Sequence, residues 1–376
     1  MMGTIGIVGG GPGGLMLARL LQRRGRKVVI FERDANIDAR PQGGSLDMHA
    51  ETGQRAMRQA DLEHAFAAEA RPEDQGDRLY DQHGTLLFDR DGSGDDRPEI
   101  DRTALRRILV DSLEPGTIQW NAKVATVESV DGGVQVVLDR VSHRFAAVVG
   151  ADGAWSRVRP LLTDARPAYE GVTLVELGFD VARHPHVDRL VGSGKMFAVG
   201  ANRVLIAQRN GDGHIRGYAG LRMKEDEARR WAQLPGDEVR AHVLDAFAEF
   251  APALTKLIID GDLLAVRPLY ALPIGLSWAP VRGITVIGDA AHLMSPFSGE
   301  GVNLALADAV DLAEALTSGK GWDAIAAFEA MMAGRAGEAA KGAAAGLDSA
   351  VSLQGVAPVL EHYKERVIAS SDRLSV

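Results

Sequence analysis

The start of the chain carries its clearest pattern of apolar and polar positions. Residues 5–8 are a short apolar run of the strand type. In residues 13–24 apolar side chains recur every three or four positions, as on one face of a helix. Residues 27–32, with the sequence KVVIFE, are a second apolar run. Together these segments predict a strand–helix–strand unit of about 30 residues, the usual length of a βαβ unit.

Helical and strand-like segments then alternate up to residue 150. Helical spacing covers residues 52–69 and 103–113. Strand-like runs cover residues 77–91, 118–139 and 146–150. The mixture predicts an α/β class with a Rossmann-like parallel sheet in the first part of the chain.

From about residue 171 strand-like runs dominate. They occupy residues 173–181, 195–199, 203–208 and 216–221, and helical spacing follows at 224–232 and 238–247. This pattern predicts a second domain built on a mostly antiparallel sheet. A buried strand returns at 283–288, followed by an apolar helix at 303–316 and a long Ala-rich helix at 322–345.

Composition narrows the functional classes. The chain has 376 residues, 46% of them hydrophobic, which suits one large domain or two joined ones. The formal net charge is −9 and no long Lys/Arg run appears, so a nucleic-acid partner is not expected. The chain has no Cys, which excludes disulfides, thiolate metal sites, Cys nucleophiles and a redox dithiol.

Targeting signals are not apparent either. Residues 4–9 read as a strand that enters a glycine turn, not as a secretion signal. No window of 18 or more apolar residues predicts a membrane-spanning helix. We therefore expect a cytoplasmic protein with no membrane partner. We also expect a monomer or weak dimer.

A glycine-rich turn joins the first predicted strand to the first helix. Gly9, Gly11 and Gly14 have the spacing GxGxxG, which allows a tight turn and lets the backbone approach a pyrophosphate at a helix N-terminus. Glu32 ends the second strand, 18 residues after Gly14 (32 − 14), where its carboxylate can accept hydrogen bonds from ribose hydroxyls. The unit predicts dinucleotide binding and leaves NAD and FAD open.

Two later motifs favour FAD. The first follows the strand at 146–150 and contains Asp152, and the second contains Asp289 and the run GEGVN at residues 299–303. Either Asp alone can be an N-cap. The glycines at 299–303, however, expose backbone N–H groups at the start of an apolar helix, where they can stabilise negative charge on a reduced flavin. His292 could be a general base, but a structural hydrogen bond is the favoured interpretation.

These motifs, in this order and spacing, resemble the class A flavin monooxygenases of the p-hydroxybenzoate hydroxylase type. Within that class GGSLDMH (43–49), EIDRTALRRIL (99–109), GDAAHLMSPFSGEGVN (288–303) and the long C-terminal helix are most similar to the tetracycline-inactivating TetX monooxygenases. The resemblance implies a discontinuous FAD-binding domain (1–75, 98–168, 270–320), a substrate-binding domain (76–97, 169–269) and a C-terminal bridging helix (321–376).

The resemblance also implies roles for single residues. Those that would bind cofactor are Gly9, Gly11, Gly14, Glu32, Arg33, Arg40 (through NADPH), Asp47, Arg106, Asp289, Gly299, Gly301, Val302 and Asn303. Pro296 and Gly299 would border the substrate. From the residues alone, Arg106 and Arg40 could equally be surface charges, and Asp152 is expected to be structural.

The implied substrate contacts depart from the TetX pattern. TetX enzymes hold tetracycline through a Gln, an Arg and a His on the middle sheet, and an alignment without gaps places Gly178, Lys195 and Arg216 there. Arg in place of His adds a permanent charge, and Lys in place of Arg loses the planar fork. Lys195 and Arg216 are therefore candidate substrate residues, with exposed strand positions as the alternative, and a tetracycline-like antibiotic is a candidate substrate.

The implied reaction needs no catalytic side chain and no metal. NADPH would reduce the FAD, O2 would form a C4a-hydroperoxyflavin, and this species would hydroxylate an aromatic or polycyclic small molecule. The protein would supply orientation and exclusion of water. Two alternatives stay open: a flavin dehydrogenase or reductase that does not oxygenate, and a non-catalytic FAD- or ligand-binding protein.

Overall fold

The computed structural model describes residues 3–40, 43–93, 96–139 and 141–373. By its internal contacts the chain divides into two units. Unit 1 comprises Met1–Ala70, Asp101–Ala168 and Tyr270–Ala343, and unit 2 comprises Arg71–Ile100, Tyr169–Leu269 and Ala344–Val376.

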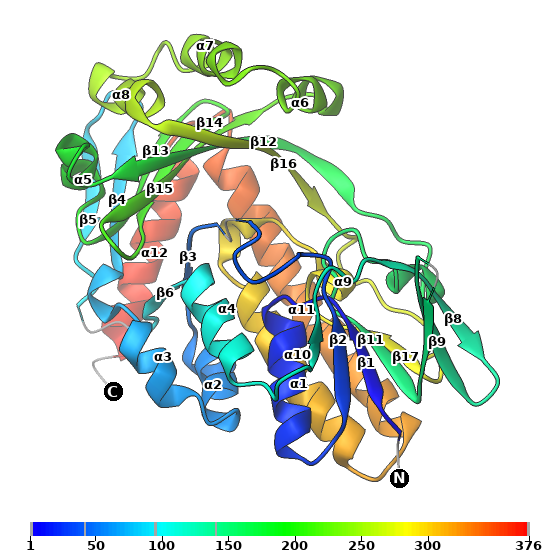
Figure 1. Ribbon diagram of the computed structural model, residues 1–376. Coiled ribbons are helices and arrows are strands. Elements are labelled where there is room, and N and C mark those ends of the chain that lie inside the picture. The colour runs from blue at the N-terminus through cyan, green and yellow to red at the C-terminus, as the bar shows by residue number, and fades with distance from the viewer. Residues whose placement is uncertain (1–2, 41–42, 94–95, 140, 374–376) are drawn as a thin grey trace. The chain divides into compact units, whose positions relative to one another are not determined.

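Unit 1 is built on the parallel sheet that the N-terminal pattern predicts. Its order is β17-β11-β1-β2-β7, with bounds β1 Ile5–Val8, β2 Val28–Phe31, β7 Ile118–Gln119, β11 Ala147–Gly150 and β17 Ile284–Val286 (Figure 1). All neighbouring strands run parallel. The strands β1, β11 and β17 are buried along their whole length, which explains why they read as unbroken apolar runs.

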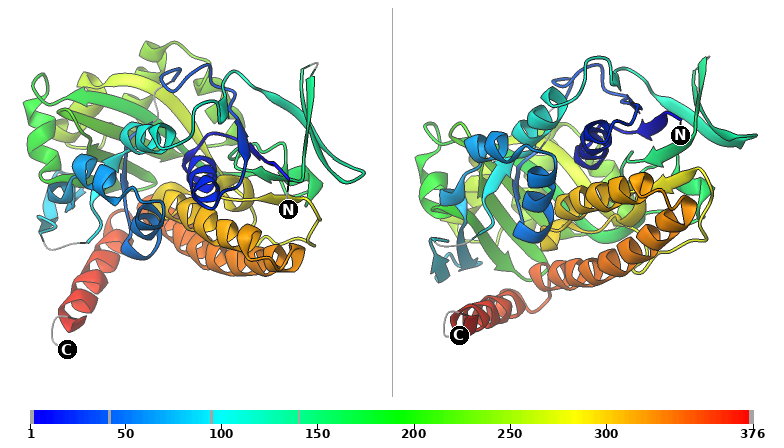
Figure 2. Two further views of the ribbon diagram at one scale, coloured as in Figure 1. Left: turned by 60° about the horizontal axis from the view of Figure 1, so that its bottom comes forward. Right: turned by 90° about the horizontal axis from the view of Figure 1, so that it is seen from below.

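The helices α1 (Pro12–Arg23) and α10 (Gly301–Thr317) pack closely against each other through small residues. A Cβ at Gly13 would lie 3.2 Å from the Ala305 carbonyl oxygen. Figure 2 shows α11 (Trp322–Ala350) alongside α10. The remaining helices of this unit are η1 Ala50–Gln54, α2 Arg55–Gln59, α3 Glu63–Glu69, α4 Arg102–Asp111, η3 Arg159–Leu161, α9 Asp289–His292 and η4 Pro296–Ser298.

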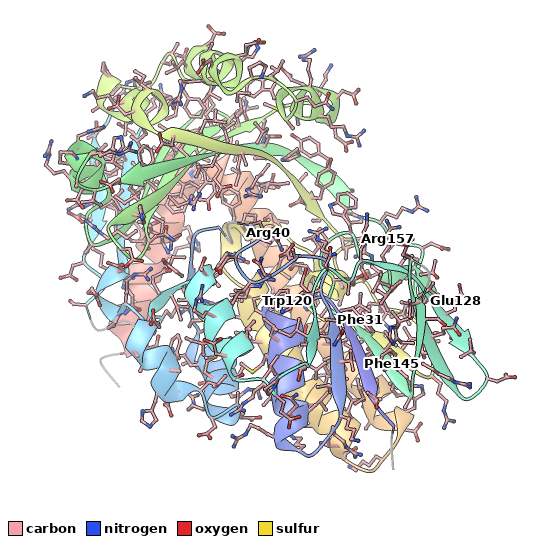
Figure 3. All side chains as sticks on the ribbon, in the orientation of Figure 1. Phe31, Arg40, Trp120, Glu128, Phe145 and Arg157 are labelled. Atoms are coloured by element: carbon pink, nitrogen blue, oxygen red, sulfur yellow. The ribbon has the colours of Figure 1, made fainter. Side chains whose placement is uncertain are left out.

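An antiparallel sheet of three strands also belongs to unit 1. It consists of β8 (Val124–Val130), β9 (Gly133–Leu138) and β10 (Val141–Phe145). Phe145 packs edge-on against Phe31 at the end of β2, with ring centroids 5.7 Å apart (Figure 3). The predicted strands in 118–139 are therefore real, but only β7 joins the parallel sheet.

Unit 2 contains the predicted antiparallel sheet. Its order is β16-β12-β15-β14-β13-β4-β5, with bounds β4 Gly76–Asp81, β5 Leu86–Arg90, β12 Ala168–Asp180, β13 Gly194–Gly200, β14 Arg203–Arg209, β15 His214–Arg222 and β16 Asp262–Ala271. Only β13 and β4 pair in parallel among the registers described. The class α/β with an antiparallel second sheet is confirmed.

One face of this sheet carries the core of unit 2. The apolar cluster contains strand residues such as Val175, Leu177, Met196 and Ala219. It also contains apolar residues of the helices α6, α7 and α8, which cover that face in Figure 1. The helices of unit 2 are η2 Pro72–Asp74, α5 Pro185–Val191, α6 Glu225–Trp231, α7 Gly236–Ala246, α8 Pro252–Asp260 and α12 Ala357–Arg373. Because strand side chains alternate, the opposite face carries the polar residues described below.

Two predicted helices differ from the structure, and some elements of the structure were not predicted. The helix expected at 52–69 is interrupted at Asp61, whose φ of 59° does not continue a helix. The strand β16 and the helices α5 and α8 were not predicted. The helix expected at 322–345 extends to Ala350, and the C-terminal bridging helix expected over 321–376 is divided into α11 and the separate helix α12.

Candidate cofactor-binding site

The glycine turn after β1 has no room for a side chain at two of its positions. Gly9 has a φ of 104°, and a Cβ there would lie 2.3 Å from the Ala151 carbonyl oxygen. A Cβ at Gly14 would lie 2.3 Å from the Gly9 carbonyl oxygen. At Gly11, by contrast, a Cβ would meet no protein atom within 4 Å. The turn therefore leaves open space at Gly11, the position where a pyrophosphate approaches such a turn.

The helix α1 begins at this turn. Gly11 is its N-cap residue, Pro12 is its first residue, and the first turn carries no acidic side chain. The partial positive charge of a helix N-terminus therefore has no negative side chain of its own helix to neutralise it. This arrangement suits an anion such as a phosphate.

Glu32 stands at the end of β2, where the sequence predicts a ribose-binding acid. Its Oε2 accepts a hydrogen bond of 2.7 Å from the Gly10 N–H, and its Oε1 accepts one of 2.9 Å from the Asp34 N–H. The side chain is 7% exposed. Two backbone donors thus hold this carboxylate beside the glycine turn.

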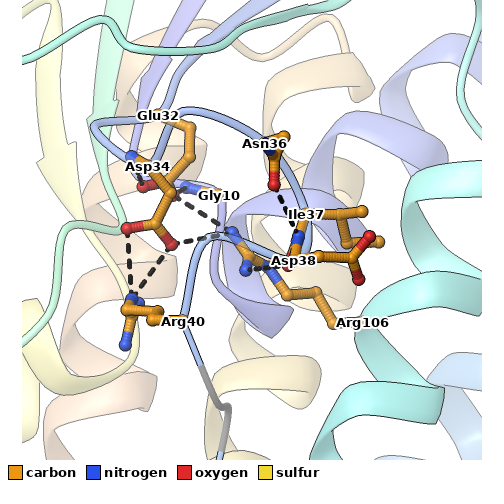
Figure 4. Close-up of polar contacts among 8 residues, drawn as sticks. All are labelled: Gly10, Glu32, Asp34, Asn36, Ile37, Asp38, Arg40 and Arg106. Carbon is orange, nitrogen blue, oxygen red and sulfur yellow. Dashed lines mark hydrogen bonds and ion pairs between the residues drawn. The ribbon is translucent and has the colours of Figure 1, made fainter.

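Arg106 reaches the same place from α4, as Figure 4 shows. Its Nη2 lies 3.3 Å from Asp34 Oδ2 and 3.8 Å from Glu32 Oε2, and its Nη1 donates to the Ile37 carbonyl oxygen. Its guanidinium carbon also lies 5.6 Å from the centre of the Trp120 ring. Arg106 is 2% exposed and is therefore not the surface cation that was the alternative.

Arg106 also has a donor left over. Its Nε is buried and has no hydrogen-bond partner among the described residues. A buried donor without an acceptor is costly, so the site has unmet capacity for an acceptor such as a phosphate or ribose oxygen. The open space at Gly11 and this donor together fit a dinucleotide such as FAD.

Asp34 is the residue of this cluster that the sequence analysis missed. Its carboxylate receives Arg106 and also Arg40, whose Nε lies 3.0 Å from Oδ2 and 3.1 Å from Oδ1. Arg40 is largely exposed, and Arg33 is exposed as well. Asp34 could have been suspected because it follows Glu32 by two residues at the same strand end.

The second predicted motif forms the turn after β17. Gly288 has a φ of 60°, and α9 starts at Asp289, whose side chain is exposed. A Cβ at Gly301, the first residue of α10, would lie 4.0 Å from Asp289 Oδ1. The Asp289 carboxylate thus lies beside the N-terminus of α10, so the two parts of the second motif are close together.

Asp47 and Asn303 meet across more than 250 residues of sequence. Asn303 is fully buried, its Nδ2 donates to the Asp47 carbonyl oxygen at 2.8 Å, and its Oδ1 accepts from the His49 N–H at 2.9 Å. A Cβ at Gly299, whose φ is 69°, would lie 2.9 Å from Asp47 Oδ1. The His49 ring lies between Asp47 and Glu300, at 3.0 Å and 3.5 Å. Asn303 therefore clamps β3 (Ser45–Asp47) to the start of α10.

Asp152 and Pro296 flank these motifs. Asp152 Oδ2 accepts the Arg157 N–H at 2.6 Å, and burial raises the pKa of this carboxyl. This contact supports the structural role expected for Asp152. Pro296 is exposed at the start of η4, and Val302 is half-buried in the first turn of α10.

In unit 2 the candidate substrate residues share one row of the sheet. Gly178, Arg216, Gln208, Lys195 and Asp77 are successive cross-strand partners on β12, β15, β14, β13 and β4. Cross-strand partners point to the same face. The row therefore lies on the face opposite the apolar core of unit 2.

Buried carboxylates accompany both cations of this row. Arg216 Nη1 lies 3.2 Å from Glu176 Oε1, and Arg267 binds the other oxygen of Glu176. Lys195 Nζ lies 4.0 Å from Asp77 Oδ2. The Glu176 and Asp77 side chains are 2% and 3% exposed, whereas the Arg216 and Lys195 side chains are 21% and 31% exposed. Arg216 and Lys195 are thus paired with buried carboxylates. Neither the interpretation as substrate residues nor the interpretation as exposed strand residues had predicted these ion pairs.

Comparison with known proteins agrees with the geometry. The model of the family "FAD binding domain" matches residues 2–323. Monooxygenase asqM of Emericella nidulans is 32% identical over 370 residues, which cover 83% of this chain and 83% of that protein. The chain therefore belongs to the FAD-binding domain family and, by class, to its FAD-dependent monooxygenases.

Solved structures share the fold. Klebsiella pneumoniae HpxO, complexed with FAD and uric acid, has a TM-score of 0.79 at 20% identity, over 99% of this chain and 94% of that one. Tetracycline destructase Tet(51) has a TM-score of 0.75 at 19% identity, over 100% of this chain and 98% of that one. Likenesses at these identities show the architecture and leave the substrate open.

The described residues contain neither a candidate membrane span nor a candidate metal site. None of the helices is both long and apolar enough to span a membrane. No group of three or more His, Cys, Asp or Glu side chains in this part of the chain could hold a metal ion.

Proposed function

We propose that this chain is an NADPH- and O2-dependent FAD monooxygenase that hydroxylates an aromatic or polycyclic small molecule. The observation that carries the cofactor part is the glycine turn with open space at Gly11, next to the buried Glu32 carboxylate and the unmatched Arg106 Nε. The family and the class supply the rest of the expectation. We expect a cytoplasmic monomer or weak dimer.

In this proposal different residues of unit 1 bind different parts of the cofactor. The N–H groups at the N-terminus of α1 and the Arg106 guanidinium bind the phosphates, and Glu32 accepts from the ribose hydroxyls. Asp289 binds the ribityl chain. The backbone from Gly299 to Asn303, with Asp47, lies along the flavin ring.

Bound FAD would supply hydride acceptance from NADPH and, once reduced, activation of O2 for transfer to an electron-rich carbon. The chain's own residues bind, orient and exclude water. The N-terminus of α10 stabilises negative charge at the flavin ring. Arg40 sits exposed on Asp34 with a guanidinium that can pair with a phosphate of NADPH.

The substrate would lie on the polar row of unit 2. Arg216 and Lys195 offer N–H donors to carbonyl, phenol or enolate oxygens, and Gln208 between them can donate or accept. Glu176 and Asp77 hold the two cations in place. A tetracycline-like molecule remains a candidate, because it presents such a row of oxygens.

The deciding experiment measures NADPH oxidation by the purified yellow protein with tetracyclines and smaller phenols, and detects the product by mass spectrometry. We expect a gain of one oxygen atom for one scaffold, with NADPH consumed in step. Arg216→Met should raise KM for that substrate and leave the FAD content unchanged. NADPH oxidation that yields only hydrogen peroxide with every substrate, or a protein that holds no flavin, would contradict the proposal.

A further inference from the structure

The turn at Gly288, which precedes Asp289, is held from both sides. Its N–H donates to Asp308 Oδ2 at 3.0 Å, and its carbonyl oxygen accepts the N–H groups of Ala291 and His292 at 2.8 and 2.9 Å. The His292 ring contacts the carboxylate oxygen that accepts from the Gly288 N–H, because its Nε2 lies 2.6 Å from Asp308 Oδ2. These contacts close a ring of bonds around the segment that presents Asp289.

Asp308 is anchored in turn by α11. It is fully buried in α10, and its second oxygen, Oδ1, accepts from Arg335 Nη2 at 2.8 Å. Arg335 also donates to Asp311, which receives Arg55 from α2 as well. The Asp308 carboxylate therefore has a fixed position set by two helices, and cannot turn away from Gly288 without losing charged partners.

The charges around His292 favour the same arrangement. Burial by itself would lower the pKa of His292, but the Asp308 charge and the hydrogen bond to it, with a contribution from Asp289, raise the pKa above its ordinary value. For Asp308, burial acts to raise the pKa, but His292, the Gly288 N–H and Arg335 lower it. The two groups therefore favour each other's charged form, and the Asp289 carboxylate also favours the charged form of His292.

We propose that His292 and Asp308 are positioning residues that hold Asp289 in the orientation in which it binds the cofactor. Neither residue needs to touch the cofactor. The ring of bonds fixes the unusual backbone of Gly288, and this backbone sets the direction of the next side chain. The inference rests on the proposed function, because it assumes that Asp289 contacts FAD.

The experiment is a double-mutant cycle on the dissociation constant of FAD, measured by quenching of flavin fluorescence on the apo-protein. The single variants are Asp289→Ala and His292→Ala, and the double variant combines them. We expect each single variant to weaken FAD binding by about 10- to 100-fold, the loss of one hydrogen bond to a charged group. The double variant should bind no more weakly than Asp289→Ala, because His292 acts through Asp289.

A conservative variant and a control complete the test. His292→Gln keeps a donor for Asp308 and should restore FAD affinity to within about threefold of wild type. Thr285→Val removes a buried hydrogen bond to Glu329 three residues before Gly288, and should lower stability without changing FAD affinity.

The outcomes separate the two ideas. Losses that add in the double variant, or a His292→Ala variant with wild-type affinity, would overturn the positioning role while leaving the FAD site intact. An Asp289→Ala variant with wild-type affinity would instead overturn the assignment of Asp289 in the proposed function, and the positioning role with it.

Discussion

The glycine turn allows a prediction in which two alanine substitutions, three residues apart, have different effects. In Gly14→Ala the new Cβ would stand 2.3 Å from the Gly9 carbonyl oxygen and 3.1 Å from Ala151 Cβ, so α1 has to move away from β1. Overpacking of this kind costs about 3 kcal/mol. Gly14→Ala should therefore lower the free energy of unfolding even without cofactor.

Gly11→Ala should leave the apo-protein nearly unchanged. Gly11 has a φ of −80°, which alanine adopts readily, and the added Cβ meets no protein atom. Loss of a good N-cap residue and the lower entropy of the unfolded chain offset each other to within about 1 kcal/mol. In the complex, however, the methyl group occupies the space that the pyrophosphate needs. If the displaced pyrophosphate loses one hydrogen bond to the turn, we expect FAD to bind about 10- to 100-fold more weakly.

The assay pairs urea unfolding of each apo-protein with a fluorescence titration of FAD. Gly11→Ala should unfold at the same urea concentration as wild type and bind FAD more weakly. Gly14→Ala should unfold at a lower urea concentration and also bind FAD more weakly. Gly25→Ala, in a turn at the far end of α1 with a φ of 70°, is a control that costs some stability without touching the site. Wild-type FAD affinity in Gly11→Ala would refute the placement of the pyrophosphate at this turn.

Three further predictions follow from the buried polar contacts. Glu32→Gln puts an amide N–H against one of two backbone donors, so urea unfolding should show a loss of about 1–3 kcal/mol, and FAD should bind more weakly in titration. Because the pKa of His292 is raised above 6.5, its pairing stabilises the fold fully below that pH and is lost as pH rises through the folded-state pKa. Unfolding free energies should therefore fall with rising pH, and His292→Gln should flatten that slope; an equal slope in both proteins would contradict the pairing. Tyr363→Phe removes a 2.9 Å hydrogen bond to the buried Asp77 carboxylate, so thermal denaturation should show a loss of about 1–2 kcal/mol, and an unchanged midpoint would count against it.

Much of unit 1 could be predicted because its signals are local. The strands β1 and β2 and the helix α1 follow from apolar spacing within a few residues. Gly9 could be assigned to a tight turn from the sequence, because glycine readily adopts a positive φ, and its φ in the structure is 104°. Glu32 could be assigned because its distance along the chain from Gly14 places it at the end of the second strand, next to the glycine turn.

Other elements had no such signal. The interruption at Asp61 was not predicted, because a single residue with a positive φ leaves the apolar spacing of 52–69 in place. The strand β16 was not predicted because its residues are mostly half-buried at the edge of the sheet, so they show no clear alternation. Both cases depend on what the segment packs against.

The sequence by itself determined the parallel sheet, the glycine turn and the two motifs of the cofactor site, since each depends on backbone conformation and spacing over short stretches. Only the tertiary structure decided that Arg106 is buried against Glu32 and Asp34, that Asn303 clamps Asp47, and that Asp308 holds Gly288. Charged and polar side chains of these types occur at the surface of most proteins. Their partners lie 20 to 256 residues away in sequence, so burial and pairing become definite only when the chain has folded.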